Sequence, residues 1–291
     1  MKYVLCIVLV SLFFYETSAQ KGAQKAELLA YNVLFSGITS GLGAVINSPK
    51  TKNKKRVFLT GFWQGGIGGL LKYSGKELIY QVGNQESLYF AWPARIVHSA
   101  GLSICENASY VRPFLKNWQF YLGFLRFDFS VDNSHPFRVR FLPEAPYAIY
   151  MASQYGNFNI SKTIQTGSII FQNPNSIIFT LKDQTQVPGA SFGRAFTVGR
   201  DWRETDYTIA HEIIHEFQFN EYQIFNSFLN RPAKKTVGKK TQKIFTNYVY
   251  ADIPYFWPFY KIFDYKSKDN YYGNIFEFEA ESSASNKYVP R

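Results

Sequence analysis

The sequence His211-Glu212-Ile213-Ile214-His215 lies within a long segment whose composition favours a helix. Two imidazoles four residues apart on an α-helix are separated by about 40° around the axis and about 6 Å along it, so both can reach one metal ion. Glu212 is rotated by about 100° around the helix axis from His211. Its carboxylate is therefore expected beside that ion, where it can take a proton from water. The pattern predicts a zinc-binding helix with His211 and His215 as ligands and Glu212 as general base. The alternative is an amphipathic helix with two exposed histidines.

A downstream segment offers a third ligand, because three glutamates alternate in the otherwise apolar stretch Asn274-Ile275-Phe276-Glu277-Phe278-Glu279-Ala280-Glu281. A catalytic zinc ion generally has three protein ligands and one open position. On a helix Glu277 and Glu281 share a face, whereas Glu279 points about 200° away from Glu277. We therefore expect Glu277 to bind the metal and Glu281 to accept a hydrogen bond from a ligand histidine. A capping box between Asn274 and Glu277 is the alternative.

Together these motifs resemble the gluzincin clan of zinc metallopeptidases, which has H-E-x-x-H on one helix and a ligand glutamate in E-x-x-x-D on a later helix. The segment from Glu277 to Glu281 is most similar to E-F-x-A-D of the CAAX-protease and HtpX-like branch, and the layout is similar to that of thermolysin. Glu281 stands where the family has aspartate. The resemblance implies one zinc ion, peptide-bond hydrolysis, and a Tyr, His or Arg that stabilises the oxyanion. The transmembrane helices of the CAAX-protease branch have no counterpart, so its prenylated substrates are not expected.

The N-terminus has the three parts of a secretory signal: Lys2, an apolar run from Tyr3 to Tyr15, and the small residues Thr17-Ser18-Ala19. The apolar run is about 13 residues long, too short for a comfortable membrane span. We expect residues 1–19 to be removed and the protein to be periplasmic, secreted or associated with the outer envelope. Removal of Cys6 would leave Cys105 as the single cysteine, which excludes an intramolecular disulfide.

Residues 20–112 predict a small glycine-containing helical region. The segment from Leu28 to Asn47 carries no charge and contains Gly37-x-x-x-Gly41, and the segment 57–71 repeats this small-residue spacing. Small residues four apart let helix backbones approach closely, in membranes and in soluble helix pairs. The polar residues of the first segment favour a close-packed soluble subdomain, and a membrane-inserted hairpin is the alternative. Whether this region is a pro-segment stays open.

The two remaining histidines have no neighbour at ligand spacing. His98 lies in a third helical stretch from about Trp92 to Ser109, and we interpret it as a packed or surface histidine, with a transition-state hydrogen-bond donor as the alternative. His135 is followed by Pro136 and is expected in a turn.

Residues 113–291 predict a zincin-like domain with a largely antiparallel sheet, so the expected fold class is α+β. Turn-forming clusters separate short aromatic and β-branched runs. These expected strands are Trp118–Phe129, Phe137–Phe141, Tyr147–Met151, Ser168–Phe171, Ser176–Lys182 and Arg194–Gly199. The last strand is expected to pair with a substrate backbone. Residues 246–272 have no assigned secondary structure and could form either a wall of a cleft or a hydrophobic brace.

The formal net charge is +11. Much of it lies in two runs, Lys50 to Arg56 and Lys234 to Lys243, which are expected to be solvated loops that could also touch an anionic membrane surface. A nuclear or nucleic-acid role conflicts with the export signal. The expected partner is a peptide or protein substrate, and the oligomeric state is open.

The sequence therefore predicts an exported zinc-dependent endopeptidase with Glu212 as general base. The alternative is a non-catalytic exported or envelope-associated binding protein on a zincin scaffold. The presence of Glu212 argues against it, because a scaffold needs no general base.

Overall fold

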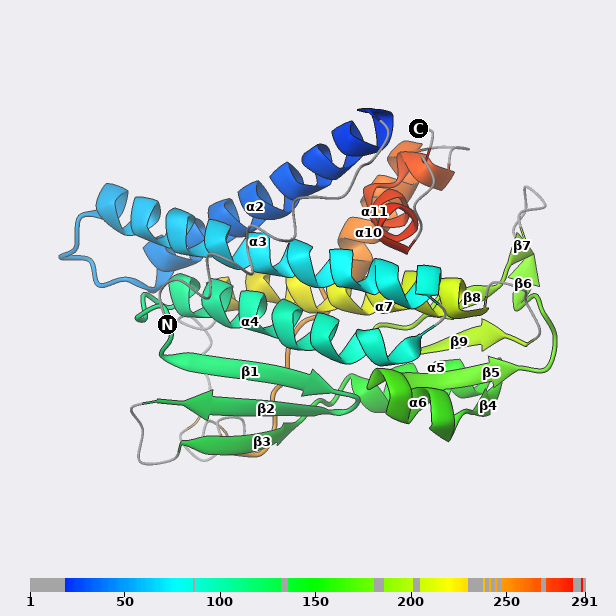
Figure 1. Cartoon of the computed structure of the whole chain (residues 1–291). Coiled ribbons are helices and arrows are strands. Elements are labelled where there is room, and N and C mark those ends of the chain that lie inside the picture. The colour runs from blue at the N-terminus through cyan, green and yellow to red at the C-terminus, as the bar shows by residue number, and fades with distance from the viewer. Residues whose placement is uncertain are drawn as a thin grey trace.

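The computed structural model of the protein describes residues 19–85, 87–131, 136–180, 186–200, 205–229, 238, 241, 244, 247–267, 271–284 and 289. Residues 1–18 of the expected signal peptide, His135, and the five lysines of the second basic run lie outside these residues. The described chain is a mixed α+β fold in which long helices lie against small sheets (Figure 1). The predicted α+β class is confirmed at this level.

Three long helices account for most of the segment before residue 112: α2 (Ala19–Asn47), α3 (Lys54–Gln85) and α4 (Ala91–Ser109). They run side by side in Figure 1, and a short 3-10 turn, η1 (Leu88–Phe90), joins α3 to α4. A Cβ atom on Gly65 would lie 2.4 Å from Ser40 Cβ, and one on Gly68 would lie 2.5 Å from Cys105 Sγ. The glycines therefore allow α3 to approach both neighbouring helices more closely than any larger residue would.

The helix α7 (Thr205–Tyr222) carries the H-E-x-x-H motif and lies behind α3 and α4 in Figure 1. As expected from their spacing, Ile209, Ile213, Ile214 and Phe217 are buried. They share one hydrophobic core with α3 and α4 residues such as Ile79. The packing is therefore continuous across residue 112, where we expected a domain boundary. After α7 the chain continues through a 3-10 turn, η2 (Gln223–Phe225), and stays helical to residue 229.

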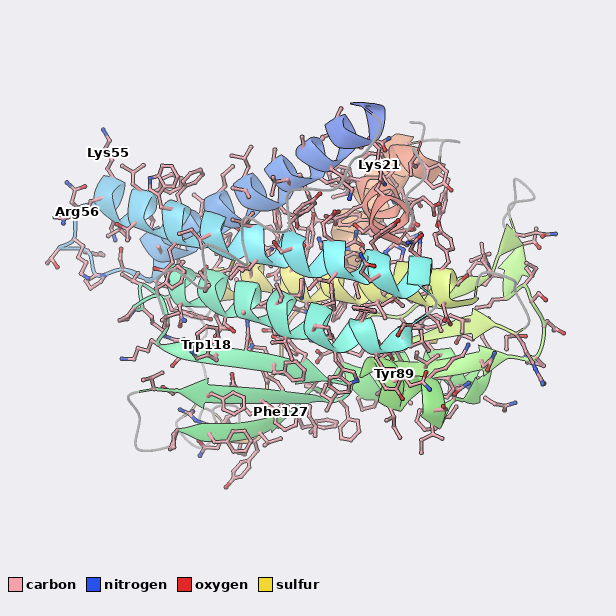
Figure 2. The ribbon with its side chains drawn as sticks, viewed as in Figure 1. Lys21, Lys55, Arg56, Tyr89, Trp118 and Phe127 are labelled. Carbon is pink, nitrogen blue, oxygen red and sulfur yellow. The ribbon has the colours of Figure 1, made fainter. Side chains whose placement is uncertain are left out.

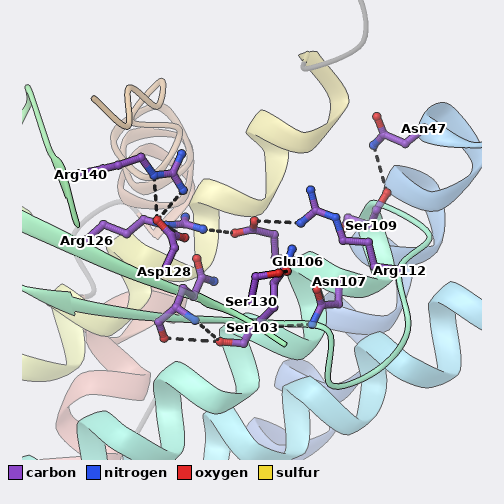
Figure 3. A network of polar contacts seen from close by, with 12 residues as sticks. Asn47, Ser103, Glu106, Asn107, Ser109, Arg112, Arg126, Asp128, Ser130 and Arg140 are labelled. Carbon is purple, nitrogen blue, oxygen red and sulfur yellow. Dashed lines mark hydrogen bonds and ion pairs between the residues drawn. The ribbon is translucent and has the colours of Figure 1, made fainter. Parts of the chain in front are cut away.

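The first sheet contains β1 (Asn117–Leu122), β2 (Leu125–Ser130) and β3 (Phe137–Phe141), all antiparallel, with Phe120 opposite Phe127. The run Trp118–Phe129 is a hairpin rather than one strand, because Gly123 with φ +55° makes a tight turn in its middle. Arg126 on β2 contacts Glu106 of α4 at 2.8 Å, and Asp128 contacts Arg140 at 2.6 Å (Figure 3). This polar network joins the sheet to α4.

The second sheet has the order β4-β5-β9-β8, and β6 pairs with β7 in a separate two-stranded ribbon. Strands β5 and β9 are parallel. The expected sheet is largely antiparallel, and this pair departs from it because the chain between β5 and β9 leaves the sheet to form the ribbon and then returns. The bounds are β4 (Asn157–Phe158), β5 (Ile169–Asn173), β6 (Phe179–Thr180), β7 (Gln186–Val187), β8 (Gly189–Ser191) and β9 (Ala195–Gly199).

Tyr147–Met151 is helical, not a strand, and belongs to α5 (Ala145–Ser153). Pro146 stands in the first turn of this helix, where its missing N–H costs nothing. Ala145, Ala148 and Ala152 are buried at helical spacing. Ala148 and Ala152 pack on the second sheet, whereas Ala145 packs with Leu102 of α4 and Tyr121 of β1. Tertiary burial of these alanines outweighs the strand preference of the aromatic and β-branched residues between them.

The remaining elements are α6 (Ile160–Thr166), α10 (Phe256–Ser267), a 3-10 turn η3 (Tyr271–Gly273), and α11 (Ile275–Ala284). Of these elements, α10 and α11 contact α7. Aromatic residues of α10 pack on Phe219, Tyr222 and Phe276. Within the segment 246–272, α10 therefore acts as a hydrophobic brace between α7 and α11.

Candidate metal centre

The two helices α7 and α11 bring together the three predicted ligands. His211 Nε2 lies 3.1 Å from His215 Nε2 and 3.3 Å from Glu277 Oε2, and His215 Nε2 lies 3.4 Å from the same oxygen. One ligand atom from each side chain thus forms a nearly equilateral triangle. Among the described residues, this is the group of three His, Cys, Asp or Glu side chains that could hold a metal ion.

The dimensions of this triangle fit zinc. A tetrahedral ion with ligand bonds of about 2.0–2.1 Å separates its ligand atoms by about 3.4 Å. Two imidazoles and one carboxylate are also a donor set used by catalytic zinc sites, which leave a fourth position open. The residues present therefore match the spacing and the chemistry that zinc requires.

Glu277 is the electrostatic centre of the triangle. Burial alone would raise the pKa of Glu277, but the two histidines hold it well below its usual range. Burial likewise lowers the pKa of His211, but the adjacent carboxylates of Glu277 and Glu281 outweigh this and raise it to about 10. The pocket thus favours a positive charge held against the Glu277 carboxylate, which is the electrostatic environment that a bound cation requires.

Two tyrosines hold the Glu277 carboxylate in place. The Tyr260 hydroxyl donates to Glu277 Oε1 at 2.5 Å, and the Tyr271 hydroxyl donates to Oε2. Asn274 N–H donates to the Tyr271 carbonyl instead of to Glu277. The capping-box alternative for Glu277 is therefore not realised, and its carboxylate points at the histidines.

Glu212 lies beside the triangle with an unused carboxylate oxygen. It is 4% exposed, and its Oε2 has no hydrogen-bond partner within the part of the chain that the structure describes. Burial raises the pKa of Glu212, although the two histidines oppose that shift. A Cβ atom on Gly189 of β8 would lie 2.4 Å from Glu212 Oε1. Glycine at this position therefore leaves the room that the carboxylate occupies.

Glu281 and Glu279 lie as the helical spacing predicts, on different faces of α11. Glu281 Oε2 is 3.6 Å from His211 Nδ1, an ion-pair distance that is longer than a hydrogen bond. Glu279 points away from the triangle and contacts Lys76 Nζ at 2.8 Å. The structure therefore places Glu281, and not Glu279, next to a ligand histidine.

The other ligand histidine is oriented by Gln218, which sequence analysis missed. His215 Nδ1 lies 2.9 Å from Gln218 Oε1, and Gln218 Nε2 donates to the Phe276 carbonyl and to Glu279 Oε2. Because both acceptors hold the amide nitrogen, the amide oxygen faces His215 and keeps its Nδ1 protonated. Nε2 is then free to bind metal. The signal in the sequence was the position of Gln218, three residues after His215 on the same helix.

We predict that Gln218→Leu weakens zinc binding by about 10- to 100-fold, the usual cost of losing a residue that orients a metal ligand. The zinc dissociation constant can be measured by competition with a coloured chelator. The matched control is Gln223→Leu, since Gln223 is also buried and its Nε2 has no partner among the described residues. Equal zinc affinities for the two variants would contradict the role of Gln218.

A buried ionic cluster supports this arrangement from behind. Lys76 on α3 is fully buried and contacts Glu221 at 2.9 Å and Glu279 at 2.8 Å. Burial alone would lower the pKa of Lys76, but these two carboxylates raise it. Asn32 of α2 donates to Glu279 at 2.6 Å. The cluster therefore links α2 and α3 to Glu279, which in turn holds Gln218.

His98 belongs to this cluster and not to the metal triangle. It is buried, stacks on Phe217, and its Nε2 lies 3.0 Å from Glu221 Oε1. Burial lowers the pKa of His98 to about 4, against the opposing effect of Glu221. The ring is neutral at pH 7 and donates its Nε2 proton to Glu221. Of the two alternatives, the packed histidine is the one that the structure shows.

The lowered pKa of His98 predicts acid destabilisation. The unfolded chain takes up this proton near pH 6.5 and the folded protein only near pH 4, so the stabilisation is complete above pH 6.5 and is lost as the pH falls towards 4. The shift corresponds to about 3 kcal/mol of unfolding free energy. In His98→Gln, which keeps an N–H donor but does not titrate, this part of the pH dependence should disappear. The free energy of unfolding is measured with urea at several pH values between 4 and 6.5. If it changed by the same amount with pH in both proteins, the prediction would be contradicted.

The expectation that Arg194–Gly199 binds substrate is wrong. Within the described chain this strand, β9, is paired with β5 on one side and β8 on the other, so both of its edges are occupied. Among the described residues the edge strands of this sheet are β4 and β8, and Gly189 of β8 lies against Glu212. Gly189 and the two tyrosines on Glu277 were not recognised in the sequence, because their roles depend on contacts between distant segments.

Comparison of the chain with protein-family models, with curated proteins and with solved structures found no match. The assignment of a function therefore depends on the geometry of the site.

Proposed function

We propose that the protein is an exported zinc-dependent endopeptidase. The observation that carries this proposal is the triangle of His211, His215 and Glu277 at zinc-ligand spacing, with the buried and unpartnered carboxylate oxygen of Glu212 beside it. The motif residues, which lie 62 or more positions before Glu277 in the chain, meet it only because α7 packs against α11. When bound, zinc acidifies water and polarises the scissile carbonyl.

The chain's own residues account for the rest of the proposed mechanism. Glu212 Oε2 accepts the proton of the attacking water and returns it to the leaving amine nitrogen. Tyr260 and Tyr271 stay protonated at neutral pH, because burial raises the pKa of both hydroxyls and the Glu277 carboxylate adds to this effect. Each hydroxyl has one proton, which it donates to Glu277, so either tyrosine would have to release that carboxylate before it could stabilise an oxyanion.

An extended peptide would bind along β8. This strand is an edge of its sheet, and its Gly189 adjoins Glu212. Addition of a substrate strand to a free edge is a common mode of peptide recognition, in which main-chain hydrogen bonds hold the substrate beside the catalytic groups. Export is supported by the signal-like sequence of residues 1–19.

A metal-binding protein without catalysis is the second candidate. It is favoured by the burial of the ligands, since His211, His215 and Glu277 are 9%, 7% and 3% exposed. A long substrate must therefore displace covering side chains, among them Tyr271, to reach them. The unpaired oxygen of Glu212 favours the peptidase, because burying an unpaired carboxylate costs stability and requires a compensating role.

The deciding experiment is reconstitution. The purified protein is incubated with an unbiased peptide library, after treatment with a chelator and again after addition of one equivalent of zinc. The proposal requires cleavage that is lost with the chelator and restored by zinc. Stoichiometric zinc binding without any cleavage would favour the second candidate, and cleavage by metal-free protein would overturn both.

A further inference from the structure

The hairpin of α2 and α3 exposes large apolar side chains at regular intervals. On α2 they recur every four residues, and on α3 the same spacing is found. The exposed residues are Leu34, Ile38, Leu42 and Ile46 on α2 and Leu59, Trp63 and Ile67 on α3, with Trp63 at 70% exposure. We call these seven residues the hairpin face. A regular apolar stripe on the outside of a fold requires an explanation that a single exposed leucine does not.

The two stripes form one surface. Phe62 lies against Gly37, and Phe58 lies against Gly41. The next residue in the chain after each of these is therefore close to its counterpart on the other helix, so Ile38 is near Trp63 and Leu42 is near Leu59 along the helix axes. A step of one residue turns each side chain by about 100°, and in antiparallel helices these turns lead to the same side of the pair. The close glycine contacts also hold the helices in this register. The hairpin face is therefore a continuous and rigid apolar surface.

Positive charge adjoins this surface at one end. Residues 28–76 contain no Asp or Glu, and the residues 28–47 and 57–71 contain no charged side chain at all. The loop between α2 and α3 together with the first turn of α3, which we call the cationic loop, carries Lys50, Lys52, Lys54, Lys55 and Arg56. Lys54 is held by carbonyl groups at the end of α2, and the other four are exposed. Figure 2 shows Lys55 and Arg56 at the tip of the hairpin, pointing away from the rest of the protein.

We infer that the hairpin face lies on an anionic lipid bilayer, with the apolar side chains in the interface and the loop cations among the headgroups. An apolar helix face flanked by lysine and arginine is typical of interfacial binding, and an exposed tryptophan prefers the headgroup region. A second copy of the chain fits less well, because it would bring another cationic loop to a region without a single carboxylate.

The hairpin lies on the bilayer and does not cross it. α2 is long and apolar enough to cross a membrane, but 44% of the residues in its most apolar stretch are buried inside the protein. The buried face includes Asn32, whose amide holds Glu279 and Lys76. Lipid on all sides of α2 would require this polar packing to be broken, whereas contact on the hairpin face leaves it intact.

Vesicle flotation tests this inference on the full protein purified after export. Vesicles of phosphatidylcholine with about 30% phosphatidylglycerol are compared with phosphatidylcholine alone, at low and high salt. We expect binding to the anionic vesicles that weakens with salt. Neutralising Lys52, Lys55 and Arg56 to Gln should weaken it by about fivefold per charge, or about 100-fold in total.

The apolar contribution is tested by Ile38→Ser with Trp63→Ser, which should also abolish flotation. The matched control is Ile160→Ser with Ile164→Ser, because these α6 residues are also large, apolar and exposed, at 64% and 65%, and lie outside the hairpin face. The inference would be overturned if the two double variants lost vesicle binding equally, or if the unmodified protein did not bind anionic vesicles. It would also be overturned if the protein were a dimer that only the hairpin-face variants dissociate. Release only by detergent would also overturn it, in favour of a membrane-spanning helix. Because the variants lie outside the metal centre, failure here leaves peptide hydrolysis unaffected, and failure of hydrolysis leaves the flotation result valid.

Discussion

Replacement of Glu212 by Gln is expected to lower the rate of peptide hydrolysis by about 10²- to 10⁴-fold, the usual contribution of a general base. Glutamine has the same shape, so it fits the space beside Gly189, but it cannot accept the proton of the attacking water. Zinc content should be unchanged, because Glu212 is not part of the ligand triangle. Turnover of a peptide selected from the library and metal analysis of the same preparation provide the two measurements.

The matched control for this prediction is Glu77→Gln. Glu77 lies on α3, forms a partly exposed pair with Lys25 and is not part of the ligand triangle, so its variant should keep full activity. A Glu212→Gln protein with full activity would exclude Glu212 as the base. A variant that loses zinc together with activity would show that Glu212 acts on the metal, contrary to the geometry described above.

Replacement of Glu277 by Gln is expected to weaken zinc binding by more than about 100-fold, which exceeds the cost of removing a residue that only orients a ligand. The amide lacks the negative charge that His211 and His215 surround, and it is a poorer zinc ligand than a carboxylate. The zinc dissociation constant and the free energy of unfolding should both be measured, because Tyr260 and Tyr271 also lose a charged acceptor.

Glu279→Gln is the informative control, because the two glutamates are neighbours on α11 and both are buried. Glu279 contacts Lys76 and Asn32, so its variant should lose about 2 kcal/mol of stability through weaker charged hydrogen bonds. The variant should lose much less zinc affinity than Glu277→Gln, because its amide oxygen can still accept from Gln218. If Glu279→Gln released zinc and Glu277→Gln did not, the ligand assignment would have to move to Glu279.

The metal centre and the buried ionic cluster form one connected structure. His215 is held by Gln218, Gln218 by Glu279, and Glu279 by Lys76, so the ligand geometry depends on charges contributed by α3. Removing one member of a buried charge network leaves the others without compensation. We therefore expect the helical segment before residue 112 to be needed for the site, since it supplies Lys76 and Asn32.

The helices around the site were the most predictable part of the fold. The ligand histidines could be paired from helix geometry alone, because residues four apart on a helix lie on one face whatever surrounds them. The same argument placed Glu277 and Glu281 on one face and Glu279 on another. Every residue of α7 from Thr208 to Tyr222 is buried, so the helical period alone did not decide which side chains of this helix lie in the interior.

The errors arose where tertiary contacts outweighed local preference. Tyr147–Met151 has the composition of a strand, but Pro146 and three buried alanines make it a helix. The parallel pairing of β5 and β9 involves strands joined by a long excursion, which no local pattern reveals. As a result, the expected substrate strand is an inner strand, and β8 is an edge.

By itself the sequence determined which residues can bind a metal and which carboxylate stands beside it, because these relations depend on the period of a single helix. The tertiary structure decided which distant groups complete the site: Gln218 and Glu279 behind His215, Tyr260 and Tyr271 on Glu277, and Gly189 against Glu212. The physical reason is the distance along the chain over which each interaction acts. Helical periodicity acts over a few residues, whereas buried hydrogen bonds and ion pairs form wherever chain packing excludes water.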